Sequence, residues 1–307
     1  MKRFLFIAIC FLGTFVSCKE ERNVSGTLDI VEDYVLPQEG ASTAANEFIL
    51  NIYKTYGSYF LYDYTSEDAL WNITSTSGNT TSVIVKGDPL YVETMLNLLN
   101  DVWLRYFPEE FLKKGGIPYR VYLADSLYDV MTNGRKTLYT YKASGSSLIV
   151  TGLNEKLLTI NDDAEKKKAW KDTFIDAMWR YYVSVGVLEI PDDFYAGTDY
   201  TTEPEVPLSE PENLLKYRQR GFLPSKYNAS SGDPNEWYSR WTWSSAKSND
   251  LNSYMYHLFS RTDEEMEEYL SNPDYVLIQK KWYILLDYFK DCCNVDPRKI
   301  ANAKFEQ

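Results

Sequence analysis

The sequence predicts an α+β protein with a small mixed sheet in its N-terminal half and a mostly helical C-terminal half. Short segments that alternate apolar and polar residues, such as 117–123, occur before residue 152. A long amphipathic pattern occupies the middle of the chain, and helical periodicity dominates from residue 212 onwards. A chain of 307 residues could form one large domain or two small ones. The order of strands before helices favours one domain.

The first half is expected to combine two helices with several strands. Helices are predicted at 46–56 and 89–107, and strands at 59–64, 117–123, 136–142 and 147–151, with a further short strand at 27–31. Residues 74–81, rich in Ser, Thr, Gly and Asn, are expected to form a loop.

The organising element is a predicted helix over 162–188. Its apolar residues are spaced three and four apart, on one helix face: Trp170, Phe174, Met178, Tyr181, Val185 and Leu188. Asp162, three residues before Glu165, has the spacing of a capping box, and Pro191 lies just beyond the end. The plain interpretation is a central packing helix.

The second half begins with an acidic, Pro-rich surface loop over 195–211. The remainder is predicted to be helical, at 211–220, 235–244, 248–260, 262–271, 274–291 and 296–304.

Composition excludes some functions. The net charge of −12 argues against binding nucleic acid through its phosphates. His257 is the one histidine, whereas a catalytic zinc site usually takes two or three. Cys292 and Cys293 are adjacent at the end of a predicted helix, where a bond between them would be strained, so both are expected to be free thiols.

The N-terminus predicts a lipid-anchored protein of the cell surface. Residues 1–17 combine a basic start with a short apolar stretch, as a secretory signal peptide does. The end, Phe15-Val16-Ser17-Cys18, resembles a bacterial lipobox, which implies cleavage before Cys18 and its acylation. Residues 18–40 would be the tether, and 41–307 a single domain. The next residues, Lys19, Glu20 and Glu21, resemble an outer-membrane surface-export signal of Bacteroidetes.

Six further segments follow one another along the chain: NEFILNIYKTYGSYFLYDYT, WLRYFPEEFLKKG, IPYRVYLADS, RGFLPSKYNASS, SNDLNSYMYHLFS and VLIQKKWYILLDYF. Their order and spacing resemble the predicted zinc-binding metallopeptidase lipoproteins of Bacteroidetes, which have a zincin-like core. The likeness covers about residues 46–304, nearly the whole mature chain.

Active members of that family carry HExxH on the central helix, which places two histidines on one face and a glutamate that activates water. The resemblance aligns Trp179 and Val183 with the two histidines and Arg180 with the glutamate. It aligns Asn252-Ser253 with the third ligand, a carboxylate. The likeness therefore implies a zincin-like fold with vestigial metal positions: a pseudo-metallopeptidase with no catalytic residue, metal or cofactor.

The resemblance implies a non-catalytic accessory component of a TonB-dependent nutrient-uptake system, beside an outer-membrane transporter and its capture lipoprotein. The ligand would be a peptide, a glycan or a partner protein. Candidate ligand-binding residues are aromatic, namely Trp237, Tyr238, Trp241 and Trp243, for which core packing is the alternative.

Two other functions stay open. One is a scaffold subunit with no ligand of its own, for which an acidic, Tyr-rich surface is equally suitable. The other is an enzyme with non-zinc hydrolase activity, for which the chain offers three pairs of adjacent carboxylates, at 109–110, 162–163 and 192–193. Adjacent carboxylates usually point apart, and these are expected to lie in helix caps and turns.

Overall fold

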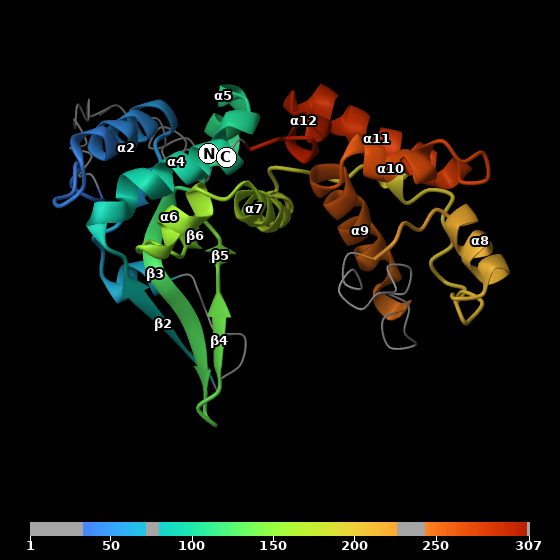
Figure 1. Ribbon diagram of the computed structural model, residues 1–307, viewed down its shortest axis with the longest axis horizontal. Helices are drawn as coiled ribbons and strands as arrows, with labels where there is room; N and C mark the ends of the chain where they lie inside the picture. Colours follow the sequence, from blue (N-terminus) through green and yellow to red (C-terminus); the bar gives the residue numbers. More distant parts are fainter. Residues whose placement is uncertain (1–32, 72–79, 226–242, 306–307) are drawn as a thin grey trace, which may run out of the picture. The chain divides into compact units, whose positions relative to one another are not determined.

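A computed structural model describes residues 33–71, 80–225 and 243–305 (Figure 1). The chain divides into two compact units, Met1–Val35 and Leu36–Gln307, and every helix and strand named below belongs to the second unit. The predicted α+β class is confirmed, because the strands all lie between residues 59 and 150 and the second half is helical. No helix within the described ranges is long and apolar enough to cross a bilayer.

Within the described residues the sheet has six strands. Its main path runs in the order β1 (Tyr59–Leu61), β3 (Arg120–Met131), β6 (Ser147–Val150) and β5 (Tyr141–Ser144). β1 and β6 both pair with β3 in parallel, and β5 closes the path antiparallel to β6. The distal half of β3 pairs antiparallel with β2 (Thr80–Lys86) and β4 (Lys136–Tyr139) in a long arm (Figure 1).

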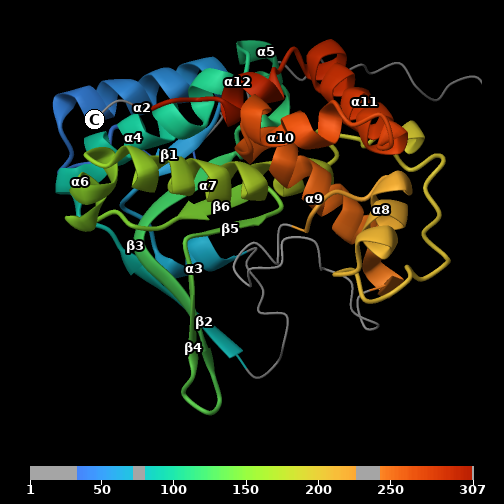
Figure 2. The same cartoon turned by 45° about the vertical axis from the view of Figure 1, so that its right-hand side comes forward.

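One face of the main sheet is covered by helices that precede residue 185 (Figure 2). They are α2 (Thr43–Tyr56), α4 (Val92–Val102), α6 (Lys156–Asn161) and α7 (Ala164–Ser184). Val121 and Leu148 of the sheet are fully buried in one core with Leu99 of α4 and Met178 of α7. This burial is what fixes α7 over the middle of the sheet.

The second half consists of helices around α9. They are η4 (Asp192–Phe194), α8 (Pro211–Gln219), η5 (Trp243–Ser245), α9 (Ala246–Ser260), α10 (Asp263–Leu270), α11 (Val276–Cys293) and α12 (Pro297–Ala301). α9 contacts α7, α11 and α12, so it joins the sheet-covering layer to the later helices. Cys292 and Cys293 are both free thiols, as expected.

The predicted helix 89–107 is wrong as one element. It is divided into η1 (Pro89–Tyr91), α4 and η2 (Leu104–Tyr106), with the break at Trp103. There the backbone leaves the helical region at φ −138° and ψ −75°. The indole of Trp103 is completely buried and donates a hydrogen bond to the Tyr182 hydroxyl at 2.8 Å, so tertiary packing overrides the local periodicity.

The predicted boundaries of the organising helix are also corrected. Asp163, rather than Asp162, caps α7, because its side chain accepts hydrogen bonds from the N–H groups of Glu165 and Lys166. Asp162 instead ends α6. At the other end the helix stops at Ser184, and the backbone N–H groups of residues 187 and 188 return to the Tyr182 carbonyl.

Periodicity missed several short elements: β2, α3 (Ser66–Leu70), α5 (Glu109–Phe111) with η3 (Leu112–Gly116), and α6. The predicted strand 136–142 is split at Thr140 into β4 and β5. The predicted strand 27–31 and most of the predicted loop 74–81 and helix 235–244 lie outside the described residues.

Candidate functional site on the central helix

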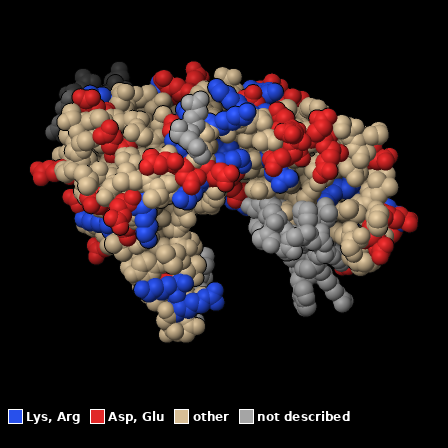
Figure 3. All heavy atoms as spheres, viewed as in Figure 1, with Lys and Arg blue, Asp and Glu red and all other residues tan. Residues whose placement is uncertain are grey.

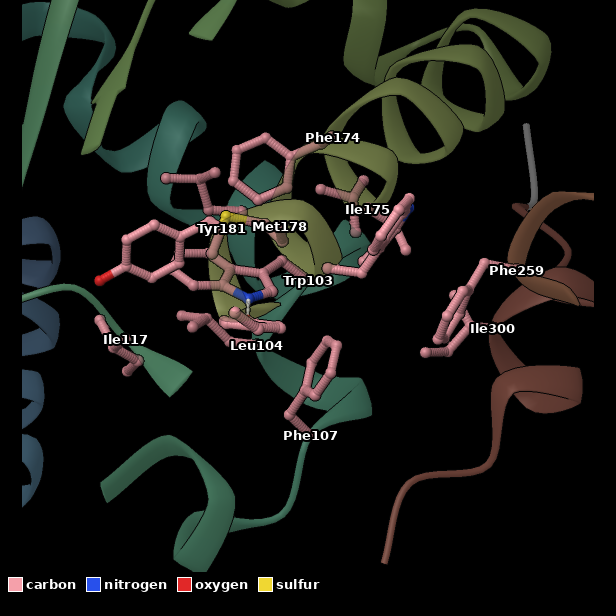
Figure 4. Close-up of a cluster of buried hydrophobic side chains, with 14 of the residues drawn as sticks. Trp103, Leu104, Phe107, Ile117, Phe174, Ile175, Met178, Tyr181, Phe259 and Ile300 are labelled. Carbon is pink, nitrogen blue, oxygen red and sulfur yellow. Dashed lines mark hydrogen bonds between the residues drawn. The ribbon is translucent and has the colours of Figure 1, made fainter. Parts of the chain in front are cut away.

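The buried face of α7 fixes the orientation of the whole helix. Phe174, Ile175, Met178 and Tyr181 point into the cluster around Trp103 (Figure 4). The opposite face of α7 therefore presents a second row of side chains toward β5 and α9, both of which contact α7. This row includes Arg180 and Val183, two of the positions that the sequence aligns with HExxH. The third, Trp179, lies one turn after Ile175 and is buried in the same core.

Arg180 is held by two helices. Its Nε lies 3.2 Å from Asp176 Oδ2, one turn earlier on α7, and its Nη1 donates to Asn252 Oδ1 of α9 at 2.6 Å. The structure thus brings Arg180 and Asn252 together although they are 72 residues apart in sequence. A guanidinium bonded to a carboxylate and an amide forms a cross-link between α7 and α9.

Trp179 and Val183 flank this cross-link. Trp179 is buried, and its indole N–H donates to Asp176 Oδ1 at 3.2 Å. The Arg180 guanidinium lies 4.7 Å from the Trp179 ring centroid, within the range of a cation–π contact. Val183 is half-buried against the main core.

The residues at these positions do not fit a zinc ion. Zinc in proteins is held by thiolate, imidazole or carboxylate ligands, and Trp179 and Val183 carry none of them. Arg180 brings a permanent positive charge and no acceptor to the same place. Among residues 33–71, 80–225 and 243–305, no group of three or more His, Cys, Asp and Glu side chains is placed to hold a metal ion.

The residues aligned with the third ligand are engaged within the protein. Asn252 is buried and its side-chain oxygen accepts from Arg180. Ser253 is also buried, and its hydroxyl donates to the Asn249 carbonyl at 2.9 Å, within α9. Both side chains therefore serve the packing of α9 in this structure.

Of the four aromatic candidates for ligand binding, only Trp243 falls within the described residues. It is 7% exposed and packs against Phe222, with ring centroids 5.7 Å apart, in a small core beside Tyr217 and Leu208. Trp243 therefore has the core-packing role that was the alternative to ligand binding. Trp237, Tyr238 and Trp241 lie outside the described residues, as do Cys18, Lys19, Glu20 and Glu21.

Five of the six adjacent carboxylates lie at helix starts, and the sixth, Asp162, ends α6. Glu109 and Glu110 lie in the first turn of α5, and residues 192 and 193 form the first turn of η4. Asp163 is the N-cap of α7, so its pair with Asp162 spans the junction of two helices. Carboxylates are favourable there because they face the positive end of the helix dipole.

Periodicity alone missed a buried ion pair between α9 and α11. Lys281 and Asp250 form a salt bridge, and both side chains are almost completely buried. The Tyr200 hydroxyl donates to Asp250 Oδ2 at 2.6 Å, and the Lys281 ammonium donates to the Gly221 carbonyl at 3.1 Å. Tyr200 lies in the loop before α8, and Gly221 lies in the loop after it. The ion pair therefore ties both of these loops to α9 and α11.

Aromatic rings surround the same ammonium. Lys281 Nζ lies 4.5 Å from the Tyr254 ring centroid and 4.6 Å from that of Phe194. Burial lowers the pKa of Lys281 and raises the pKa of Asp250, and the attraction between the two charges opposes both shifts. The sequence did carry a signal, because Lys281 lies three residues after Ile278 and four before Leu285 on the apolar face of α11.

The contacts of the one histidine also indicate a structural role. His257 is buried in α9, and its Nε2 lies 2.8 Å from the Pro224 carbonyl oxygen. Because a carbonyl only accepts, Nε2 must carry the proton and Nδ1 the lone pair. Burial lowers the pKa of His257 to about 4, which keeps the ring neutral at pH 7.

The charged surface is mixed. In Figure 3 acidic and basic side chains are interspersed over the helices, while basic ones gather toward the end of the β3–β4 hairpin. Arg135 and Lys136 are exposed there, and the Lys136 ammonium lies 4.7 Å from the Tyr128 ring centroid. The hairpin therefore contributes positive charge to an otherwise acidic protein.

No protein-family model matches the chain, and no curated protein matches it. Among solved structures, the model is similar to a crystal structure from Bacteroides caccae described as a "putative zinc-binding metallo-peptidase". The similarity has a TM-score of 0.48 at 15% sequence identity, and it covers 86% of this chain and 91% of the other. A likeness of this size does not extend to activity, metal or ligand.

Proposed function

We propose that this chain is a non-catalytic, lipid-anchored surface protein that serves an outer-membrane nutrient-uptake system by binding a peptide, a glycan or a partner protein. The leader and Cys18 support the anchor, and Lys19, Glu20 and Glu21 support export to the surface. The ordered segments that resemble the Bacteroidetes metallopeptidase lipoproteins support a pseudo-metallopeptidase with a zincin-like core.

The observation that carries the non-catalytic part is the cross-link of Arg180 with Asp176 and Asn252. A protein that used zinc here would need neutral or negative ligands at these positions. In this chain a cation that cannot lose its proton lies among them, and it repels a second cation. The same cross-link stabilises the packing of α7 against α9, so these positions keep a structural role without the metal.

Zinc content and peptide hydrolysis test this part directly. After dialysis against zinc and then buffer, we expect well below one equivalent of zinc and no hydrolysis that a chelator abolishes. The quadruple variant Trp179→His, Arg180→Glu, Val183→His, Asn252→Asp restores the two histidines, the glutamate and a carboxylate at the position of the third ligand, and serves as a positive control for zinc detection. One equivalent of zinc in the native chain, with hydrolysis that the chelator stops, would overturn the proposal.

Purification from outer membranes in mild detergent tests the accessory role. We expect a TonB-dependent transporter and its capture lipoprotein to co-purify with the chain. Recovery of the chain alone would contradict membership of an uptake complex. Peptide hydrolysis that survives a chelator would instead favour an enzyme with non-zinc chemistry.

A further inference from the structure

A pocket lies between α2 and the segment that follows α4, on elements distinct from the α7–α9 cross-link. Its volume is about 400 Å³, within the range of small-molecule sites. One wall is a single face of α2, because the five residues that line it recur at steps of three and four: Phe48, Asn51, Ile52, Thr55 and Tyr56. α2 and α4 run beside each other in both ribbon views and are in contact (Figures 1 and 2).

The other wall comes from the end of α4, from η2 and from α5 with η3. It consists of Asn100, Leu104, Arg105, Phe107, Glu109 and Leu112. Leu104 and Leu112 are buried, as is Ile52 of α2, so the floor is apolar. Phe48 and Tyr56 are eight residues apart on α2, which places their Cα atoms about 12 Å apart along the helix axis.

Four polar side chains in this pocket form no hydrogen bond with any of the described residues: Asn51, Thr55, Tyr56 and Asn100. The two amides and two hydroxyls offer both donors and acceptors from the two walls of the pocket. Each amide can donate to one hydroxyl of a ligand and accept from its neighbour. Such groups on an apolar and aromatic floor match a molecule with a hydroxylated edge and an apolar ring face.

The charged residues of the pocket are already paired. Arg105 bonds to Asp101 at 3.2 Å and to the Tyr106 hydroxyl at 3.0 Å. Glu109 forms a salt bridge with Lys113. With one cation and one anion, each bound to a neighbour, the pocket has no net preference for a charged ligand.

We propose that this pocket binds a neutral saccharide, with Asn51 and Asn100 bonding its hydroxyls and the ring of Tyr56 or Phe48 stacking on a sugar face. From the proposed function the inference takes only the premise that the chain binds a ligand. It does not depend on the lipid anchor, the transporter or the state of the α7–α9 cross-link. Because Phe48 and Tyr56 lie about two turns apart on α2, each can stack on a separate sugar ring, which favours an oligosaccharide over a free monosaccharide.

Titration calorimetry of the full chain with neutral oligosaccharides tests the inference. The probes are oligomers of glucose, xylose, mannose, galactose and N-acetylglucosamine, with galacturonate oligomers and acidic peptides as charged alternatives. We expect binding to at least one neutral oligomer. In the double variant Asn51→Ala, Asn100→Ala, we expect affinity to fall by about tenfold or more, the effect of losing two neutral hydrogen bonds.

The matched control is Asn97→Ala. Asn97 is exposed on α4, three residues before Asn100, and does not line the pocket, so its replacement should leave affinity unchanged. Tyr56→Phe keeps the ring and should weaken binding less than Tyr56→Ala, which removes it.

Three results would overturn the inference. They are no binding of any neutral oligomer, full affinity in the double variant, and preference for the charged probes. Because calorimetry uses the isolated chain, failure of the uptake proposal in co-purification leaves this test unaffected.

Discussion

Lys281 and Asp250 form an ion pair in the interior of the protein, where each charge alone would be strongly unfavourable. Tyr200, the Gly221 carbonyl and the nearby aromatic rings supply further partners for Asp250 Oδ2 and the Lys281 ammonium. At the scale of single residues, the interior therefore tolerates charge only where a compensating group is present.

We expect Asp250→Leu to lower the free energy of unfolding by about 3–5 kcal/mol, because it leaves the Lys281 ammonium buried and unpaired. Lys281→Met should cost a similar amount. The double variant should be clearly more stable than the sum of the two losses implies, since no unpaired charge remains. Urea denaturation of all four proteins measures this cycle, and strictly additive losses would show that the pair is not coupled.

His257 predicts a pH dependence. Its pKa is lowered to about 4 in the folded protein, so between pH 6.5 and 4 the unfolded chain binds a proton that the folded chain does not. The free energy of unfolding should therefore fall by about 3 kcal/mol over this window and level off below it.

Denaturation at pH 7 and pH 4.5 checks the prediction against His257→Gln. Gln keeps a donor for the Pro224 carbonyl but does not titrate, so the difference between the two proteins isolates His257 from the carboxylates. An equal loss of stability in both proteins would assign the pH dependence to other groups.

At the scale of elements, the end of α9 depends on a side chain from α12. Arg298 donates to the carbonyls of residues 257, 258 and 261 and also bonds to Asp263, the first residue of α10. The last carbonyls of a helix have no partner within it, and this guanidinium supplies one. One side chain thus joins the ends of α9, α10 and α12.

We expect Arg298→Met to destabilise the protein by about 3 kcal/mol, because it leaves several carbonyls without their charged donor. Arg298→Lys should recover only a minor part, since an ammonium cannot span three carbonyls as the planar fork does. Asp263→Asn should cost less than about 1 kcal/mol, because the Asp263 side chain is 69% exposed. Thermal and urea denaturation compare the three; a fully stable Lys variant would contradict the capping role.

At the scale of the whole molecule, the proposed anchor precedes the described domain. Cys18→Ala should move the chain from the membrane fraction to the soluble fraction, because it removes the residue that the proposed anchor requires for acylation. Fractionation and immunoblotting measure this, with Cys292→Ala as the matched control that keeps Cys18. A Cys18→Ala chain that stays membrane-bound after cleavage of the leader would contradict the anchor.

The sequence by itself determined the fold class and the elements with long, regular periodicity. Most of α2, α7, α9 and α11 was placed because a continuous apolar face records both the helix and its buried side. Thr262 was predicted to start a helix, and it caps α10 through a capping box with Glu265. Local chemistry of this kind is readable without the fold.

Only the tertiary structure decided the rest. Trp103 ends α4 because its indole is buried against Tyr182, and a strand as short as β1 is held by pairing with β3. The cross-link of Arg180 to Asn252, the partners of Lys281, and the pocket shared by Asn51 and Asn100 join residues far apart in the chain. The physical reason is that helix and strand periodicity report burial along one element, whereas a site depends on which elements meet.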